Sequence, residues 1–269
     1  MRHIVGGSIV AAFLGAVLPG CGTAPDNPSF ALSALDARKA LREMRESPRP
    51  LGRPVVVVHG LGPPVGSWVL VHQLKALTRD DRVVSADYDC LASFEASRRR
   101  VVDEVERRFP GDDPACTREV DVVAVSMGGV LARYAAAPPA GAPGKRLKIA
   151  RLFTISSPHR GAEMASLPAL LGDVQVGLRH DSPFLRELSR REATAPAYEI
   201  VPYARLGDRV VGVENAAPEG RTPLWLPNLP LEAAHLAAFS DPRIVADIAR
   251  RLRGEAPYAT EPWQPLPKG

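Results

Sequence analysis

The chain has 269 residues, of which 45% are hydrophobic, so it is long enough and apolar enough to bury the core of one catalytic domain. Its formal net charge is only +4. Basic residues are interspersed with acidic ones, as where residues 98–100 are all arginine and Asp103, Glu104 and Glu106 follow. Such a mixture is typical of a solvated helix face and argues against a nucleic-acid-binding patch. We therefore expect no nucleic-acid partner.

Residues 1–20 have the three parts of a signal peptide for export. A basic residue, Arg2, is followed by an apolar run over residues 4–18, and a small residue, Gly20, ends the segment. The apolar run is too short and too rich in glycine to span a membrane comfortably. The pattern therefore predicts an exported protein.

The stretch Leu18-Pro19-Gly20-Cys21 resembles the lipobox of bacterial lipoproteins, in which the cysteine is acylated and becomes the new N-terminus. This resemblance implies a protein of the bacterial cell envelope, anchored to a membrane through a lipid on Cys21 or held in the periplasm. Pro19 departs from the small residue usual at its position. An ordinary secretory peptide, cut elsewhere, is therefore the alternative.

Two terminal segments are expected to lie outside the catalytic domain. Residues 21–53 are punctuated by prolines around a helical patch at residues 31–45, which predicts a tether with a short helix. Residues 254–269 contain four prolines without periodicity, which predicts a loose, proline-rich tail.

Residues 54–253 alternate between β-branched runs and helical periodicity. We expect a clear helix over residues 93–109, and strands over residues 55–58, 82–88, 120–125, 151–155 and 198–203. Continuous apolar runs suit strands that are buried on both faces, and their alternation with helices indicates parallel βαβ units. Pro202 lacks an amide donor, which suggests the end of a strand or an edge position. The sequence predicts an α/β fold with a mostly parallel, doubly wound sheet and helices on both faces, so that catalytic groups gather at the carboxyl ends of the strands.

Residues 159–196 interrupt this alternation with many apolar residues at helical spacing. The segment forms either a small helical cap over the active site or ordinary packing helices. The residues themselves leave both interpretations open.

Cys90 and Cys116 could form a disulfide in an exported chain. The helix expected between them advances about 1.5 Å per residue, however, whereas a disulfide needs Cα atoms within roughly 7 Å. The cysteines also lack the close spacing of zinc ligands, and the histidines are not spaced as a metal-binding pair on one helix. We expect neither a metal site nor a cofactor.

The strongest motif is the run Ala124-Val125-Ser126-Met127-Gly128-Gly129, between a buried strand and a helix. A serine in such a turn is held in a strained conformation that lifts its hydroxyl above the sheet, and only small residues two positions away leave room for it. Gly128 meets this condition, while Ala124 stands where a glycine is usual. The amides at the start of the helix also favour developing negative charge. We interpret Ser126 as a nucleophile, with a phosphate-cradling or purely structural turn as the alternative.

With this motif in place, the chain resembles the lipase and esterase branch of the α/β-hydrolases, including bacterial triacylglycerol lipases and the GPI inositol-deacylase-like group. The matching stretches span most of residues 54–253 and are Val55-Val-Val-Val-His-Gly-Leu-Gly62, Val122-Val-Ala-Val-Ser-Met-Gly-Gly129, Thr154-Ile-Ser-Ser-Pro-His-Arg-Gly161 and the end that contains Asp208 and His235.

The resemblance implies an oxyanion hole and residues that shape the site. The amides of Leu61 and Met127 would stabilise the oxyanion of ester cleavage. Further site-shaping residues implied by the resemblance are His59, Gly60, Gly62, Gly128 and His159.

Chain order selects the other two members of a catalytic triad. Only His235 follows both Ser126 and a suitable carboxylate, as the Ser, Asp, His order of this fold requires. Asp208 lies in a strand-end turn, preceded by glycine and followed by valines, that matches the family pattern. Asp173 and Asp181 are rival carboxylates in the helical insertion. We predict that Asp208 holds His235 in the correct tautomer.

The predicted activity is hydrolysis of carboxylic esters through an acyl-enzyme on Ser126. The apolar insertion and the expected membrane anchor favour a lipid or long-chain ester substrate. An acyltransferase or thioesterase using the same residues is one alternative, and a membrane-tethered binding or lipase-helper protein without turnover is another.

Overall fold

The computed structural model describes residues 26–139, 144–167, 172–194, 197–229 and 231–267, and the expected signal peptide and Cys21 lie outside these ranges. The described strands form one sheet in the order β2-β1-β3-β4-β5-β6, in which every pairing is parallel. The strands are β1 (Val55–Val58), β2 (Val83–Ala86), β3 (Val120–Val125), β4 (Ile149–Ile155), β5 (Glu199–Arg205) and β6 (Leu224–Leu226). The predicted parallel α/β architecture is confirmed.

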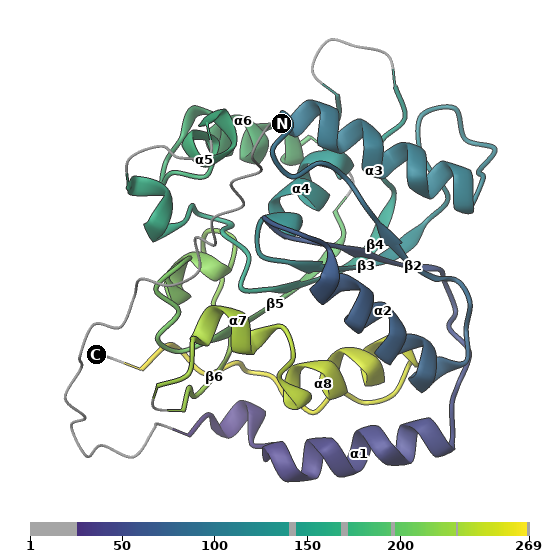
Figure 1. Ribbon diagram of the computed structural model, residues 1–269, viewed down its shortest axis with the longest axis vertical. Coiled ribbons are helices and arrows are strands. Elements are labelled where there is room, and N and C mark those ends of the chain that lie inside the picture. The colour runs from purple at the N-terminus through teal and green to yellow at the C-terminus, as the bar shows by residue number, and fades with distance from the viewer. Residues whose placement is uncertain (1–25, 140–143, 168–171, 195–196, 230, 268–269) are drawn as a thin grey trace, which may run out of the picture.

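Helices cover both faces of the sheet (Figure 1). One face packs against α3 (Phe94–Arg108) and α4 (Met127–Ala136), and α5 (Gly172–Gly177) and α6 (Pro183–Glu192) extend the same buried cluster, α6 by packing on α4. The other face packs against α2 (Val65–Thr78) and α8 (Pro242–Leu252), and α1 (Ala34–Glu46) packs outside these two helices. The short helix α7 (Ala234–Ala238) packs on β5, and 3₁₀ turns occupy Pro28–Phe30 (η1), Glu163–Ser166 (η2) and Val213–Ala216 (η3). None of these described helices is both long and apolar enough to cross a membrane.

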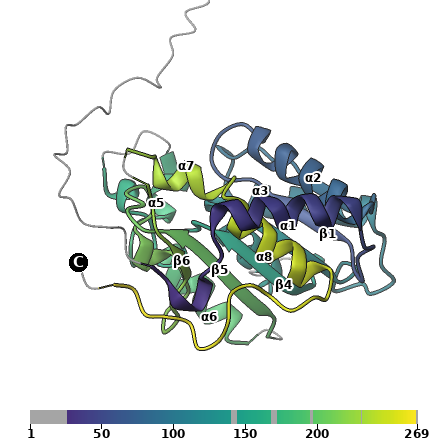
Figure 2. The same cartoon turned by 90° about the horizontal axis from the view of Figure 1, so that it is seen from below.

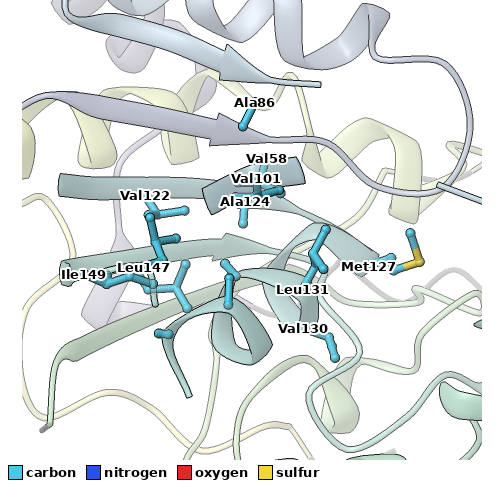
Figure 3. Close-up of a cluster of buried hydrophobic side chains, with 14 of the residues drawn as sticks. Val58, Ala86, Val101, Val122, Ala124, Met127, Val130, Leu131, Leu147 and Ile149 are labelled. Atoms are coloured by element: carbon cyan, nitrogen blue, oxygen red, sulfur yellow. The ribbon is translucent and has the colours of Figure 1, made fainter. Parts of the chain in front are cut away.

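The central strands are buried on both sides, as their apolar runs predict. All four valines of β1 have no exposed surface. Alternate residues of β1 and β3 face opposite helical layers, so Val58 and Ala124 join Val130 and Leu131 of α4 in one cluster (Figure 3). This cluster fixes the position of α4 beneath the carboxyl end of β3.

The observed strands agree closely with the expected ranges, but β6 was not predicted. Its three residues lie between Pro223 and Pro227, so the run is too short to show a period. Pro202 lies inside β5, between β4 and β6, rather than on an outer strand. The Tyr203 carbonyl accepts the Ser156 amide on the β4 side. Backbone groups of neighbouring strand residues point to opposite sides, so those of residue 202 point toward β6. Pairing with β6 begins only at Tyr203. The missing amide of Pro202 therefore leaves no ladder bond unmade.

The segment expected to be a tether is packed on the domain over its described residues. Helix α1 begins after Ser33, which caps it by accepting the Asp36 amide. The buried side of α1, including Leu41 and Met44, lies against α8 and α2 (Figure 2). The amphipathic spacing of this helix is therefore used for packing.

The proline-rich tail is also held in place over its described residues. Asp247 of α8 is buried, and its Oδ1 accepts the amides of Tyr258 and Ala259 at 2.5 and 2.9 Å. The Oδ2 atom accepts the Tyr203 hydroxyl at 2.6 Å and Arg251 Nε at 2.8 Å. One carboxylate thus joins β5, α8 and the tail, a tertiary contact that local sequence does not indicate.

If α1 belongs to the folded unit, truncating its buried face must destabilise the whole domain. We expect Leu41→Ala to lower the free energy of unfolding by about 2–5 kcal/mol because it opens a cavity between helices. Leu35, 71% exposed on the same helix, provides the matched control, and Leu35→Ala should change stability by about 0.5 kcal/mol or less. Urea unfolding of both variants measures the difference, and equal stabilities would contradict the packing of α1.

Candidate active site

Ser126 occupies the sharp turn between β3 and α4, as its motif predicts. Its φ and ψ angles are 51° and −129°, a conformation that residues with side chains rarely adopt. A Cβ at Gly128 would overlap the carbonyl oxygens of Val58 and His59, and one at Gly60 would lie 2.8 Å from Ser126 Cβ. Both glycines are therefore required by close backbone approach.

His235 lies in α7 with its imidazole between Ser126 and Asp208. The Nε2 atom is 3.1 Å from Ser126 Oγ, and the Nδ1 atom is 2.9 Å from Asp208 Oδ2. Because an ionised carboxylate only accepts hydrogen bonds, Nδ1 carries the proton that is donated to Asp208, and neutral Nε2 is free to accept the Ser126 hydroxyl. The structure thus brings together the three side chains that chain order selected.

Asp208 is held as a carboxylate in a buried turn after β5. Its Oδ1 accepts the amides of Val210 and Val211 at 2.9 and 3.1 Å. Burial alone would raise the pKa of Asp208, but the hydrogen bond and charge interaction with His235, together with these two amides, outweigh it and lower the pKa below its ordinary value. The group therefore stays charged beside the imidazole.

The rival carboxylates lie elsewhere. Asp173 is exposed in the first turn of α5, and Asp181 is exposed and pairs with its neighbour His180. Neither is paired with His235. Their exposure identifies them as surface groups of the insertion.

The loop after β1 lies beside the serine. His59 Nδ1 donates to the Gly60 carbonyl at 2.8 Å, its Nε2 accepts the Tyr88 amide at 3.4 Å, and its ring stacks on Tyr88 at 4.1 Å. The Tyr88 hydroxyl donates to the His59 carbonyl at 2.7 Å. Tyr88 thus positions this loop and was not predicted from the sequence, although its place just beyond β2 could have indicated it.

Leu61 and Met127, whose amides are the expected oxyanion donors, both line the cavity at Ser126. Met127 is the first residue of α4, so its amide has no acceptor within the helix. Gly62 has a φ of 99°, which favours glycine, and its amide donates to Cys90 Sγ at 3.2 Å. Cys90 and Cys116 are both free thiols, so the possible disulfide is not formed.

His159 lies behind the cavity rather than on its wall. Its Nδ1 accepts Arg133 Nη1 at 3.2 Å, so its Nε2 carries the proton and donates to Thr154 Oγ1 at 2.9 Å. Burial, reinforced by the charges of Arg133 and Arg221, lowers the pKa of His159 well below its ordinary value and keeps it neutral. His159 therefore shapes the site indirectly, by holding the turn after β4 whose Pro158 does line the cavity.

A cavity of about 620 Å³ opens at Ser126 and His235. Its far wall comes from the insertion and includes Ala162, Ala165, Val174 and Leu178. The later part of the insertion, α6, instead packs against α4, where Arg133 forms an ion pair with Glu192. Within the described segment, the first part therefore contributes to the cavity wall, whereas α6 packs on α4.

The walls of this cavity are mostly apolar. Asp, Glu, Lys and Arg are absent from the described residues that line it, and its polar side chains are His59, Ser67, Ser126, Gln175 and His235. No group of three or more potential metal ligands occurs among the described residues. The arrangement can therefore activate a hydroxyl next to a space that suits an uncharged, apolar group.

No family model matches the sequence, and no curated protein matches it either. Among solved structures, lipase B from Aspergillus fumigatus is 15% identical with a TM-score of 0.54, and the alignment covers 85% of this chain and 59% of that one. Phospholipase PlaB from Legionella pneumophila, in complex with thio-NAD, is 14% identical with a TM-score of 0.49, covering 73% of this chain and 57% of that one. The chain thus spans less than two thirds of each protein's length. The likeness to lipase B, with the all-parallel sheet, shows the α/β-hydrolase fold.

The contact between Gly128 and the end of β1 predicts that Gly128→Ala displaces α4 and the serine turn. We expect kcat to fall by about 100-fold or more, because small misplacements of a reacting group are costly. At Gly52, which is exposed and away from the cavity, an added Cβ meets nothing within 4 Å, so Gly52→Ala is the matched control and should change kcat little. Steady-state ester hydrolysis measures both, and wild-type turnover by Gly128→Ala would contradict the steric argument.

The hydrogen bonds of Asp208 predict two effects of Asp208→Asn. Because the amide cannot fix the His235 tautomer in the same way, kcat should fall by about 10⁴-fold. The lowered pKa means that the carboxylate stabilises the fold above its unfolded pKa and that this contribution is lost as the pH falls through the folded pKa. The stability difference between wild type and variant should therefore be present at about pH 5 and shrink in stronger acid. Urea unfolding across this range checks the sign, and a difference that grows in acid would contradict it.

Proposed function

We propose that this chain, which has the α/β-hydrolase fold, is a serine hydrolase that cleaves carboxylic esters of lipids or other long-chain acyl groups. The observation that carries the proposal is the hydrogen-bonded series Asp208–His235–Ser126, with separations of 2.9 and 3.1 Å, at the mouth of an apolar cavity. A purely structural serine turn would need neither the imidazole nor the buried carboxylate behind it.

The proposed mechanism follows from the acceptor at His235 Nε2. Ser126 Oγ attacks the ester carbonyl carbon while its proton passes to Nε2, and Asp208 stabilises the resulting imidazolium. The carbonyl π electrons move to the oxygen, which accepts hydrogen bonds from the amides of Leu61 and Met127. When the carbonyl reforms, the bond to the leaving alcohol breaks and that alcohol takes the proton from His235. Water then repeats the sequence and releases the carboxylic acid.

The substrate class is argued from the cavity and its rim. A wall without Asp, Glu, Lys or Arg among its described residues disfavours a charged acyl group. Leu61, Met164, Leu167 and Leu236 line the cavity and are each more than 40% exposed, so the opening is apolar as well. An apolar rim around an apolar cavity fits a hydrocarbon chain better than a small polar ester.

The export proposal rests on residues 1–21, which lie outside the described part of the chain. The apolar run and the lipobox-like stretch support secretion into the bacterial cell envelope, with a lipid on Cys21 as a membrane anchor. Metabolic labelling with a radiolabelled fatty acid, with Cys21→Ser as the control, tests the lipid anchor. Equal incorporation of label into both proteins would exclude acylation at Cys21.

Removing the serine hydroxyl must abolish ester hydrolysis. We expect Ser126→Ala to lower kcat by about 10⁴-fold or more at unchanged thermal stability. In a series of p-nitrophenyl esters, kcat/KM of the wild type should rise with acyl length, by up to about fourfold per buried methylene, until the cavity is filled. Substantial activity of Ser126→Ala would overturn the assignment, and a preference for acetate over longer esters would overturn the substrate class.

The same assay separates the alternatives. Covalent labelling of folded wild-type protein by a fluorophosphonate, absent in Ser126→Ala, is expected of a hydrolase, whereas failure to label would favour a binding or helper protein without turnover. Parallel reactions with thioesters and with glycerol as acceptor distinguish a hydrolase from a thioesterase or an acyltransferase. Higher kcat/KM for the thioester, or transfer exceeding hydrolysis, would replace the proposed reaction class.

A further inference from the structure

The segment that presents His235 has little regular structure of its own. It runs from the end of β6 at Leu226 to the start of α8 at Pro242, and its described residues contain only α7, a helix of five residues. A helix this short is not stable in isolation. The position of His235 therefore depends on the packing of α7 against β5 and on contacts on either side of α7.

Arg205 makes such contacts on both sides. It is the last residue of β5, and its side chain is 5% exposed. Its Nη2 donates to Glu232 Oε2 at 2.5 Å, and its Nε lies 3.7 Å from Asp241 Oδ2. Glu232 precedes His235 and Asp241 follows it, so one guanidinium joins both flanks of the segment to the sheet.

The two flanks are themselves ordered. The Asn228 amide group donates to the carbonyls of Leu229 and Glu232 at 3.1 and 2.9 Å, which closes the turn before α7. Asp241 caps α8 and accepts two hydrogen bonds from the Arg243 guanidinium at 2.9 and 2.6 Å. Arg205 therefore connects two locally ordered pieces, through a hydrogen bond from Nη2 to Glu232 and through an ion pair of Nε with Asp241 that is too long for a hydrogen bond.

The same strand end also positions Asp208. Beyond Arg205 the Leu206 amide donates to the Leu226 carbonyl at 2.9 Å, and Gly207, with a φ of 76°, turns the chain into Asp208. One short piece of backbone thus carries the carboxylate that binds His235 Nδ1 and the cation that holds the flanks of His235. A shift of either flank would therefore change the distance from His235 to Ser126.

We propose that Arg205 is a positioning residue for the reaction, which holds His235 in register with both Asp208 and Ser126 by binding Glu232 and Asp241. This inference rests on the proposed function. Loss of Arg205 is compatible with folding, because Asp241 keeps Arg243 and its capping amide, and the side chain of Glu232 is 40% exposed and can be hydrated. Arg205 therefore acts mainly on the alignment of the imidazole.

The experiment compares Arg205→Met, which keeps the length and removes the charge, with Arg205→Lys and Glu232→Gln. The matched control is Arg243→Met, which removes a second arginine from the same Asp241 but has no contact with Glu232 in the described structure. We expect Arg205→Met to lower kcat at least tenfold with KM within twofold of wild type, at a temperature well below every melting midpoint. Arg205→Lys should restore part of kcat, and Arg243→Met should lower the melting temperature while keeping kcat.

Coupling between the two partners gives a readout that a general loss of stability would not change. If Arg205 acts through Glu232, the double variant Arg205→Met/Glu232→Gln should be no slower than Arg205→Met alone. Fully additive losses, or equal losses of kcat in Arg205→Met and Arg243→Met, would overturn the proposal. So would wild-type kcat in Arg205→Met.

A second measurement does not depend on turnover. Amide hydrogen exchange over residues 234–238, followed by mass spectrometry, should be faster in Arg205→Met than in wild type or Arg243→Met. Unchanged exchange would reject the positioning role of Arg205 even if the protein hydrolyses esters. Faster exchange in a protein whose wild type neither labels at Ser126 nor hydrolyses any ester would reject the proposed function but retain the anchoring of α7.

Discussion

The close approach of α4 to the end of β1 is the constraint on which the site depends. Gly128 lies so near the carbonyl oxygens of Val58 and His59 that no side chain fits between them. The chain must therefore turn sharply between β3 and α4, and Ser126 takes a positive φ as a result. The strain is sustained because the flanking elements are deeply buried, with Ala124 and Val130 fully enclosed in the same cluster. Packing of the core thus determines where the hydroxyl points.

Near this turn, two buried ionisable side chains, Asp208 and His159, each have hydrogen-bonding partners. Asp208 is buried, yet two backbone amides and His235 keep its pKa low. His159 is buried as well, but beside Arg133 it stays neutral and serves as a hydrogen-bonding bridge to Thr154. The two histidines therefore differ in role because their surroundings differ, one between a carboxylate and a hydroxyl and the other between a guanidinium and a hydroxyl. Burial without such partners would destabilise either site.

The insertion lies at the carboxyl ends of the strands, whereas α1 and the tail lie on one helical layer of the sheet. The first part of the insertion, including Ala162 and Leu178, closes the cavity at the carboxyl ends of the strands, while α6 is anchored to α4 through Arg133 and Glu192. On the opposite helical layer, α1 and the tail pack on α8, and Asp247 of α8 joins the tail to β5. The strand end at Arg205 joins both regions, since it leads to Asp208 and binds the flanks of the segment that carries His235. The same strand end therefore contributes both to the packing of the fold and to the alignment of the site.

The sequence by itself determined the features that depend on neighbouring residues. The valine run of β1, the helix over residues 93–109 and the glycines around Ser126 were predictable because periodicity and steric limits are local. Chain order also indicated Asp208 and His235, but their meeting with Ser126 is a contact between distant segments that only the tertiary structure placed. The short strand β6, the packing of α1 and the tail, and the bridge made by Arg205 were likewise decided by tertiary contacts. Such contacts leave no period in the sequence, because each joins single residues whose separation along the chain is set by the fold.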